Sequence, residues 1–221
     1  DLIGNDNIEK IWNFFMSKGL TAEQTAGAIG NIMRESGGYP QRKQGRPESE
    51  NYPDPNSAGG SGWGLIQWTP GGKVLDIAKR ANITGTISEL STQLELVWWH
   101  LNNETATGKK NFINEFKQTK TVEEAVKSWE YGMEGAGDKA IPNRIMHANT
   151  AYAKYSKNPV TANGGTTTGT SADGCAVACS AQTAKSDVVL DPGHSKVKTI
   201  PQYNSEGIQI GEYSNEPELS N

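Results

Sequence analysis

The sequence predicts an all-α domain of about seven helices over residues 1–157, then a linker over 158–184 and the opening strand of a truncated α/β domain over 185–221. Three observations support this prediction. Apolar residues recur at helical spacing through the first 157 residues, and no alternating strand pattern occurs there. The composition changes abruptly near residue 158. Beyond residue 185 the hydrophobic pattern is that of a short buried strand.

Two helices are expected in the first 40 residues. The first follows Asn5 or Asp6 as an N-cap, and its apolar face consists of Ile8, Ile11, Trp12 and Phe15. Thr21 and Gln24 have the spacing of a capping box at the start of the second helix, which should end at the Gly37-Gly38 pair.

Three more helices have clear signals after an irregular segment over residues 37–62. The segment 90–101 is the most apolar of them. Thr121 and Glu124 form a second predicted capping box, and Pro142 opens a last helix that continues to Tyr155. We therefore expect the whole helical core to lie before residue 157.

Composition and charge exclude several classes of protein. Hydrophobic residues make up 34% of the 221 residues, and no apolar run approaches the roughly 20 residues that cross a bilayer. The formal charge is −4 and no run of Lys or Arg occurs, so we expect a soluble chain that binds no nucleic acid and inserts into no membrane. The start at Asp1 has no signal-peptide pattern and is interpreted as a processing point.

The segment 158–184 is rich in Thr, Gly, Ala and Ser, has no aromatic residue and is predicted to be a linker. It contains Cys175 and Cys179, whose spacing fits neither a C-x-x-C redox motif nor half of a typical zinc site. A local disulfide or two free thiols are the expected states, with metal binding as a minor alternative.

Glu35 is the first candidate for catalysis. It lies in the last turn of the second predicted helix, where the negative end of the helix dipole and burial against aromatic residues would raise the pKa of its carboxyl group. A raised pKa lets a general acid hold a proton near neutral pH. The alternative is a surface glutamate in contact with Arg34 or Lys43.

A second element combines glycines, two tryptophans and a glutamine over residues 61–69, a mixture suited to holding a sugar by stacking and amide hydrogen bonds. Together with the helix that ends in Glu-Ser-Gly, its Gly-Leu-x-Gln string resembles goose-type lysozymes and lytic transglycosylases. The resemblance is closer to the phage tail lysozyme family over residues 7–157. The shared motifs are Ile11-Trp12-Asn13-Phe14, Gly30-Asn31, Gly-x-x-Gln-Trp-Thr, and Thr92-Gln93-Leu94-Glu95 with Trp98.

This resemblance implies a lysozyme-like fold and bacterial peptidoglycan as the substrate. It implies that Glu35 protonates the glycosidic oxygen, and that Trp63, Gln67 and Trp68 line the glycan cleft. No cofactor is expected for this domain. Glu134, in Tyr131-Gly132-Met133-Glu134, is similar to a Tyr-Glu element of the family, which makes it a further candidate for the substrate site.

The second carboxylate is not assigned by the resemblance, because the positions of the goose-type acids hold Ala58 and Thr69 here. Asp54 is our first candidate, with Glu48 and Glu50 as others, to position a water for hydrolysis. Without such an acid, a sugar hydroxyl would close an anhydro product, as in lytic transglycosylases. Glu95 is either a cleft residue or a structural carboxylate on an apolar helix.

The string Val188-Val189-Leu190-Asp191-Pro192-Gly193-His194 resembles the first strand and metal turn of zinc-dependent N-acetylmuramoyl-L-alanine amidases. The resemblance covers residues 186–221 and implies His194 as the first zinc ligand and Glu218 or Glu216 as the second. The remaining histidine ligand and the catalytic glutamate are expected beyond Asn221, so amidase activity is not expected from these residues alone. The alternative is a histidine at a strand end with no metal.

The sequence as a whole predicts a peptidoglycan hydrolase of the endolysin or phage tail lysin type, located outside the cell, in the cell wall or on the virion. A non-catalytic peptidoglycan-binding or structural tail module with a lysozyme-like fold is the alternative, because fold alone does not establish activity.

Overall fold

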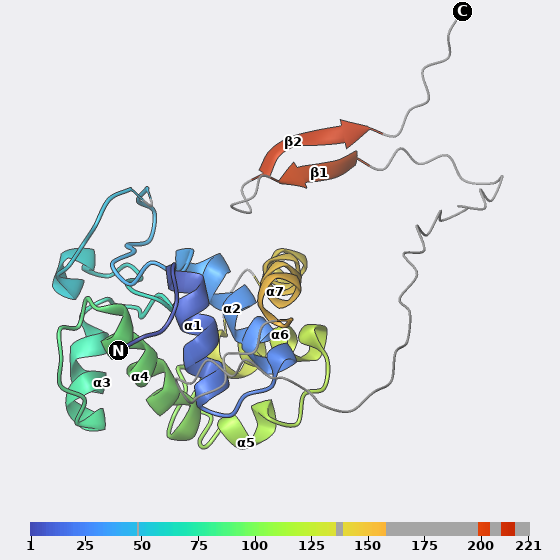
Figure 1. The fold of residues 1–221 in the computed structure, drawn as a ribbon. Coiled ribbons are helices and arrows are strands. Elements are labelled where there is room, and N and C mark those ends of the chain that lie inside the picture. Colours follow the sequence, from blue (N-terminus) through green and yellow to red (C-terminus); the bar gives the residue numbers. More distant parts are fainter. Residues whose placement is uncertain (48, 136–138, 158–198, 204–208, 215–221) are drawn as a thin grey trace, which may run out of the picture. The chain divides into compact units, whose positions relative to one another are not determined.

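The computed structural model describes residues 1–47, 49–135, 139–157, 199–203 and 209–214. The chain divides into two compact units, Asp1–Ala162 and Asn163–Asn221. The described helices all lie in the first unit, and Figure 1 labels the principal ones. Their bounds are α1 (Asn7–Ser17), α2 (Ala22–Ser36), η1 (Pro55–Ala58), α3 (Lys73–Ala81), α4 (Leu90–Asn102), α5 (Ile113–Phe116), α6 (Val122–Trp129), η2 (Glu130–Glu134) and α7 (Ile141–Tyr155).

The prediction of a helical domain is confirmed: seven α-helices and no strand occur in the described residues up to 157. Local signals set the helix ends as expected. Asp6 caps α1 by accepting a hydrogen bond from the Glu9 amide, and both predicted capping boxes are present, at the starts of α2 and α6. Gly37 ends α2 in the left-handed conformation with a φ of 66°.

Helix α2 is the centre of this unit and packs against α1, α6 and α7 (Figure 1). Two glycines on α2 make the close packing possible. A Cβ on Gly27 would lie 2.4 Å from the Ala125 Cβ of α6, and one on Gly30 would lie 2.4 Å from the Arg144 carbonyl oxygen of α7. The absence of these side chains brings the backbones of α6 and α7 onto α2.

An aromatic cluster fixes the carboxyl end of α6. The ring of Trp129 meets the rings of Phe15 and Phe116 edge to face, with centroid distances of 6.0 Å and 5.4 Å. All three side chains are fully buried. The π-helical turn η2 follows Trp129 directly, so this packing also fixes where η2 begins.

The irregular segment before α3 is held by buried side chains. The amide of Gln93, on α4, accepts a hydrogen bond from the Leu65 N–H at 2.9 Å and donates to the carbonyl oxygens of Pro40 and Ile87 at 2.6 Å and 2.9 Å. The indole of Trp63 is fully buried and donates to the Tyr52 carbonyl oxygen at 2.7 Å. These contacts give residues 61–69 a fixed position although they form no regular helix or strand.

In the second unit, β1 (Thr199–Tyr203) and β2 (Gln209–Ser214) pair antiparallel, with a register shift between Gln202 and Tyr203. The predicted strand at 185–190, the predicted linker, Cys175 and Cys179 all lie outside the described residues. No helix in the described part of the chain is both long and apolar enough to cross a membrane.

Candidate active site

A cleft of about 700 Å³ lies where the carboxyl end of α2 meets the segment 61–69, α3, η2 and α7. Its lining combines polar and charged side chains with a small apolar area. Its lining includes Glu35, Arg42, Gln67, Trp68, Lys73, His100, Glu134 and Arg144. A cleft of this volume is in the range of small-ligand sites in proteins.

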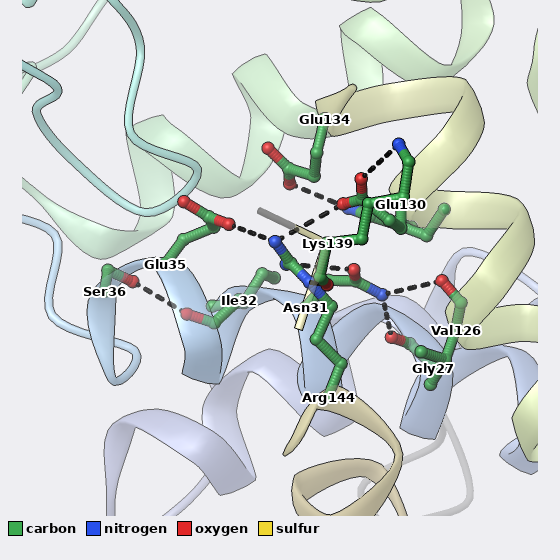
Figure 2. Close-up of polar contacts among 11 residues, drawn as sticks. Gly27, Asn31, Ile32, Glu35, Ser36, Val126, Glu130, Glu134, Lys139 and Arg144 are labelled. Atoms are coloured by element: carbon green, nitrogen blue, oxygen red, sulfur yellow. Dashed lines mark hydrogen bonds and ion pairs between the residues drawn. The ribbon is translucent and has the colours of Figure 1, made fainter. Parts of the chain in front are cut away.

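Glu35 reaches the cleft from the last turn of α2, just before the left-handed Gly37. Its side chain is 18% exposed, so one side faces the cleft and the other faces the protein. On the protein side, Oε1 accepts a hydrogen bond from Nη2 of Arg144 at 2.7 Å (Figure 2). The carboxylate is thereby held in one orientation at the wall of the cleft.

Arg144 is almost completely buried and extends from α7 toward α2 and η2 (Figure 2). Its Nη1 donates to the Asn31 Oδ1 at 3.1 Å, and its Nε donates to the Lys139 carbonyl oxygen at 2.8 Å. Nη2 also lies 3.3 Å from Oε2 of Glu130. The guanidinium therefore joins two carboxylates, Glu35 at the cleft and Glu130 behind it.

Glu130 has no exposed surface, and its second oxygen accepts a hydrogen bond from Nζ of Lys139 at 3.1 Å. A buried charge is tolerated in proteins only when it is paired. The two carboxylates of Glu35 and Glu130 balance the two cations of Arg144 and Lys139. A further carboxyl group in this cluster can be accommodated without a net charge only if it carries a proton.

Glu134 is that further carboxyl group. It lies on η2, lines the cleft, and accepts a hydrogen bond from Nε1 of Trp129 at 2.9 Å. Burial, followed by the negative charge of Glu35, raises the pKa of Glu134 to about 8. The cleft thus contains one carboxyl group that keeps its proton near neutral pH beside one that is paired with arginine.

The opposite wall is formed by Gln67 and Trp68. Gln67 has a positive φ of 51°, and its Nε2 donates to the carbonyl oxygens of Gly64 and Arg42 at 2.8 Å and 3.3 Å. Nε1 of Trp68 donates to Nε2 of His100 at 3.1 Å. This hydrogen bond assigns the proton of the imidazole to Nδ1, which lies 2.7 Å from the Glu104 carbonyl oxygen.

Of the residues that the sequence predicted for the site, four line this cleft together: Glu35, Gln67, Trp68 and Glu134. Trp63 lies elsewhere, in the core, with no exposed surface for a sugar to stack on. Glu95 lines a different hollow beside α1 and pairs with Lys18 at 2.9 Å.

Two of the three candidates for a second acid in the irregular segment, Asp54 and Glu50, do not line the cleft. Asp54 is exposed and caps η1, with Oδ1 accepting from the Asn56 amide at 2.9 Å. Glu50 is exposed and accepts a hydrogen bond from the Tyr52 hydroxyl. Glu48 lies outside the described residues, as do the zinc candidates His194, Glu216 and Glu218. Within the described ranges, no group of three or more His, Cys, Asp or Glu side chains could hold a metal ion.

Sequence reasoning missed Arg42, Lys73 and His100 in the cleft lining. It also missed Arg144 in that lining and the buried Glu130 behind it. Both had a detectable signal, since each places a charge on the apolar face of its helix. Arg144 shares its face of α7 with Ala148 and Tyr155, and Glu130, the first residue of η2, follows the buried Val126 of α6 by four residues. A charged residue on a buried helix face must find a partner, which predicts an internal ion pair.

Comparison with known proteins places these features in a family. Residues 6–155 match the phage tail lysozyme family. The chain is also 31% identical over 121 residues to morphogenesis protein 1 of Bacillus phage B103, an alignment that covers 53% of this chain and 30% of that protein.

Proposed function

The chain belongs to the phage tail lysozyme family, and we propose that its helical domain cleaves the glycan strand of peptidoglycan by general acid catalysis. The observation that best supports this proposal is the pair formed by Glu35 and Glu134 in one cleft. One carboxyl group is oriented by Arg144, and the other keeps a proton because its pKa is raised to about 8.

In the proposed reaction, Glu35 is the acid that protonates the glycosidic oxygen, and Glu134 supplies the proton. The proposed transfer from Glu134 to Glu35 passes through a water of the cleft that both side chains line, and it leaves the total charge of the cluster unchanged. After the proton has passed to the leaving oxygen, two carboxylates remain beside Arg144. Their negative charge stabilises the oxocarbenium-like transition state of glycoside cleavage.

Gln67 is proposed to contact the sugar, and Trp68, which lines the cleft but is only 4% exposed, to support that part of the wall. The Gln67 amide is fixed by its donation to Gly64 and Arg42, and the Trp68 ring is fixed by His100. Because these partners set the orientation before substrate arrives, little entropy is lost on binding. Trp63 and Asp54 are not included in the proposed site, since one lies in the core and the other caps η1 away from the cleft lining.

The test uses purified cell walls and the variants Glu35→Gln and Glu134→Gln. We expect each to lower the rate of lysis by about 10²- to 10⁴-fold, because each removes a transferable proton while keeping the size of the side chain. Glu123→Gln, an exposed residue paired with Lys127 on α6, is the matched control and should retain activity. Full lysis by Glu35→Gln would contradict the proposal.

Mass spectrometry of the released fragments then identifies the reaction. Reducing sugar ends indicate that water attacks, whereas anhydro ends indicate that a sugar hydroxyl closes the ring. Because Glu134 is the second carboxyl group of the cleft in the described part of the chain, and Asp54 caps η1 instead, Asp54→Asn should leave the product type unchanged.

A second candidate function, a structural tail module without catalysis, is favoured by the relative whose name is morphogenesis protein 1. The two candidates differ in one measurement. A structural module would sediment with purified walls while releasing no soluble fragments, and its Glu35→Gln variant would bind the walls in the same way as the unmodified chain.

The amidase assignment is a separate proposal that rests on the sequence of residues 186–195 alone. His194 and one of Glu216 or Glu218 would hold zinc, which would supply an activated water for amide hydrolysis. Zinc content measured on a chain extended past Asn221, with His194→Ala as the comparison, tests it. Equal zinc content in the two chains would contradict the assignment.

A further inference from the structure

The charge of the cleft differs in sign from that of the chain. The whole chain has a formal charge of −4, yet the cleft is lined by Arg34, Arg42 and Lys73 in addition to Arg144. Arg144 is compensated by Glu35 and Glu130. Apart from Glu35 and Glu134, no acidic side chain of the described residues lines the cleft, and Glu134 is protonated near neutral pH. The cleft is therefore cationic in a protein that is anionic overall.

Arg42 is the best defined of these cations. Its backbone carbonyl oxygen accepts hydrogen bonds from the Gly64 N–H at 2.8 Å and from Nε2 of Gln67 at 3.3 Å, which fixes the residue next to the proposed sugar-binding side chain. Nη1 of Arg42 is enclosed and has no hydrogen-bond partner in the described part of the chain. A guanidinium nitrogen without an acceptor is unfavourable, and because Arg42 lines the cleft, a rotation of its side chain would let this nitrogen meet an acceptor that enters there.

Lys73 adds a second charge on the same cleft. It is the first residue of α3, its side chain is exposed, and no described residue forms an ion pair with it. Arg42 and Lys73 thus bring a guanidinium and an exposed ammonium to one cleft, a combination suited to carboxylates because the guanidinium provides two parallel donors and the ammonium adds charge.

We propose that Arg42, assisted by Lys73, binds a carboxylate carried by the peptidoglycan strand, on the lactyl group or on the stem peptide. This inference rests on the proposed function and adds a determinant of substrate choice to it. A neutral glycan of N-acetylglucosamine presents no carboxylate, so it lacks the group that these cations recognise. The subsite formed by Arg42 and Lys73 thus selects peptidoglycan over uncharged polysaccharides. This selection does not require the two carboxyl groups of Glu35 and Glu134.

The experiment measures binding rather than cleavage, in the Glu35→Gln background, by titration with three soluble ligands. The first is a glycan fragment with stem peptides, the second is the same fragment after removal of the peptides so that only lactyl carboxylates remain, and the third is a neutral N-acetylglucosamine oligomer. Adding Arg42→Gln should weaken binding of the first ligand about tenfold or more and leave the third unchanged. If Arg42→Gln also lowers the affinity for the second ligand, the carboxylate that Arg42 binds is that of the lactyl group. If only the affinity for the first ligand falls, the carboxylate belongs to the stem peptide.

Two controls protect this interpretation. Lys79→Gln removes a cation from the same helix as Lys73 but outside the cleft lining, and it should not change any of the three affinities. Arg42→Lys keeps the charge without the paired donors and should recover part of the binding. The thermal midpoint of each variant shows whether it is folded.

The outcomes separate the two proposals. If Arg42→Gln changes the affinity for all three ligands equally, or for none, the carboxylate subsite is wrong and the proposed function stands. If the Glu35→Gln chain binds none of the ligands, the proposed function and the subsite fail together. Raising the salt concentration should weaken binding of the carboxylate ligands only, since the interaction is between charges.

Discussion

Nη2 of Arg144 lies 2.7 Å from Oε1 of Glu35, although 109 residues separate them in the chain. This contact joins α7 to the carboxyl end of α2 and is possible because Gly30 lets the two helices approach closely. It also connects the surface of the cleft to the buried Glu130, since the same nitrogen lies 3.3 Å from that carboxylate. The proposed acid is therefore oriented by a group whose own position depends on the core.

Replacement of Arg144 by methionine should destabilise the fold by about 3 kcal/mol, because it leaves the buried Glu130 with Lys139 as its only described cationic partner. Lysis should also fall, since Glu35 loses its orientation. Chemical denaturation measures the first effect and wall turbidity the second. The matched control is Lys154→Met, on the same helix as Arg144. It breaks the exposed ion pair of Lys154 with Asp6 and should lower stability by about 1 kcal/mol or less. Equal effects of the two substitutions would show that the Arg144 network contributes no special stability.

Replacement of Gly30 by alanine should lower stability by about 1–3 kcal/mol, because the new Cβ would lie 2.4 Å from the Arg144 carbonyl oxygen and would push α7 away. The activity of the folded fraction should fall as well, since the displacement moves Arg144 relative to Glu35. Gly60→Ala is the control, because nothing lies within 4 Å of a Cβ at that position. A Gly30→Ala protein with unchanged stability would mean that the α2 and α7 backbones can separate at no cost.

The raised pKa of Glu134 predicts a stability that falls with pH. The carboxyl group has a pKa of about 8 in the fold and 4.5 as its ordinary value, so between these values the folded chain binds more protons than the unfolded chain. Its contribution to the free energy of unfolding therefore decreases as pH rises from about 4.5 to about 8. Glu134→Gln has no titrating group at this position. Denaturation of both proteins at several pH values should show the variant gaining relative stability toward pH 8, and a constant difference would contradict the assignment.

The lowered pKa of His100 predicts the opposite trend, a stability that falls as the pH decreases. Burial, with added repulsion from Lys73 and Arg80, lowers the pKa of its imidazole below the ordinary value of 6.5. Below pH 6.5 the unfolded chain therefore binds a proton more readily than the folded chain does. The contribution of His100 to the free energy of unfolding is complete above pH 6.5 and is lost as the pH falls below that value. Protonation would also break the hydrogen bond from Trp68. His100→Gln keeps a donor and an acceptor without titrating, and the stability difference from the unmodified chain should change below pH 6.5. A difference that is independent of pH would contradict this prediction.

Features that depend on near neighbours in the chain were predictable from the sequence. The caps of α1, α2 and α6 were predicted because a side chain and a backbone amide three residues apart are enough to form them. Gly37 as the end of α2 was predicted for the same reason, since a left-handed residue needs no distant partner. Glu35, Gln67, Trp68 and Glu134 were recognised from short motifs, although nothing in those motifs states that the four lie in one cleft.

Which side chains contact one another and which are buried depends on how distant segments of the chain pack together. Trp63 and Trp68 are five residues apart and both are buried, yet only Trp68 reaches the cleft lining. Their indoles donate to different parts of the chain, the Tyr52 carbonyl oxygen and the His100 ring. From the sequence, the end of its own helix and neighbouring aromatic residues were expected to set the environment of the Glu35 carboxyl group. In the structure that group accepts a hydrogen bond from Arg144 and shares the cleft with Glu134. Charge pairing and burial depend on how helices far apart in the sequence pack together, and the spacing of residues along one helix does not contain that information.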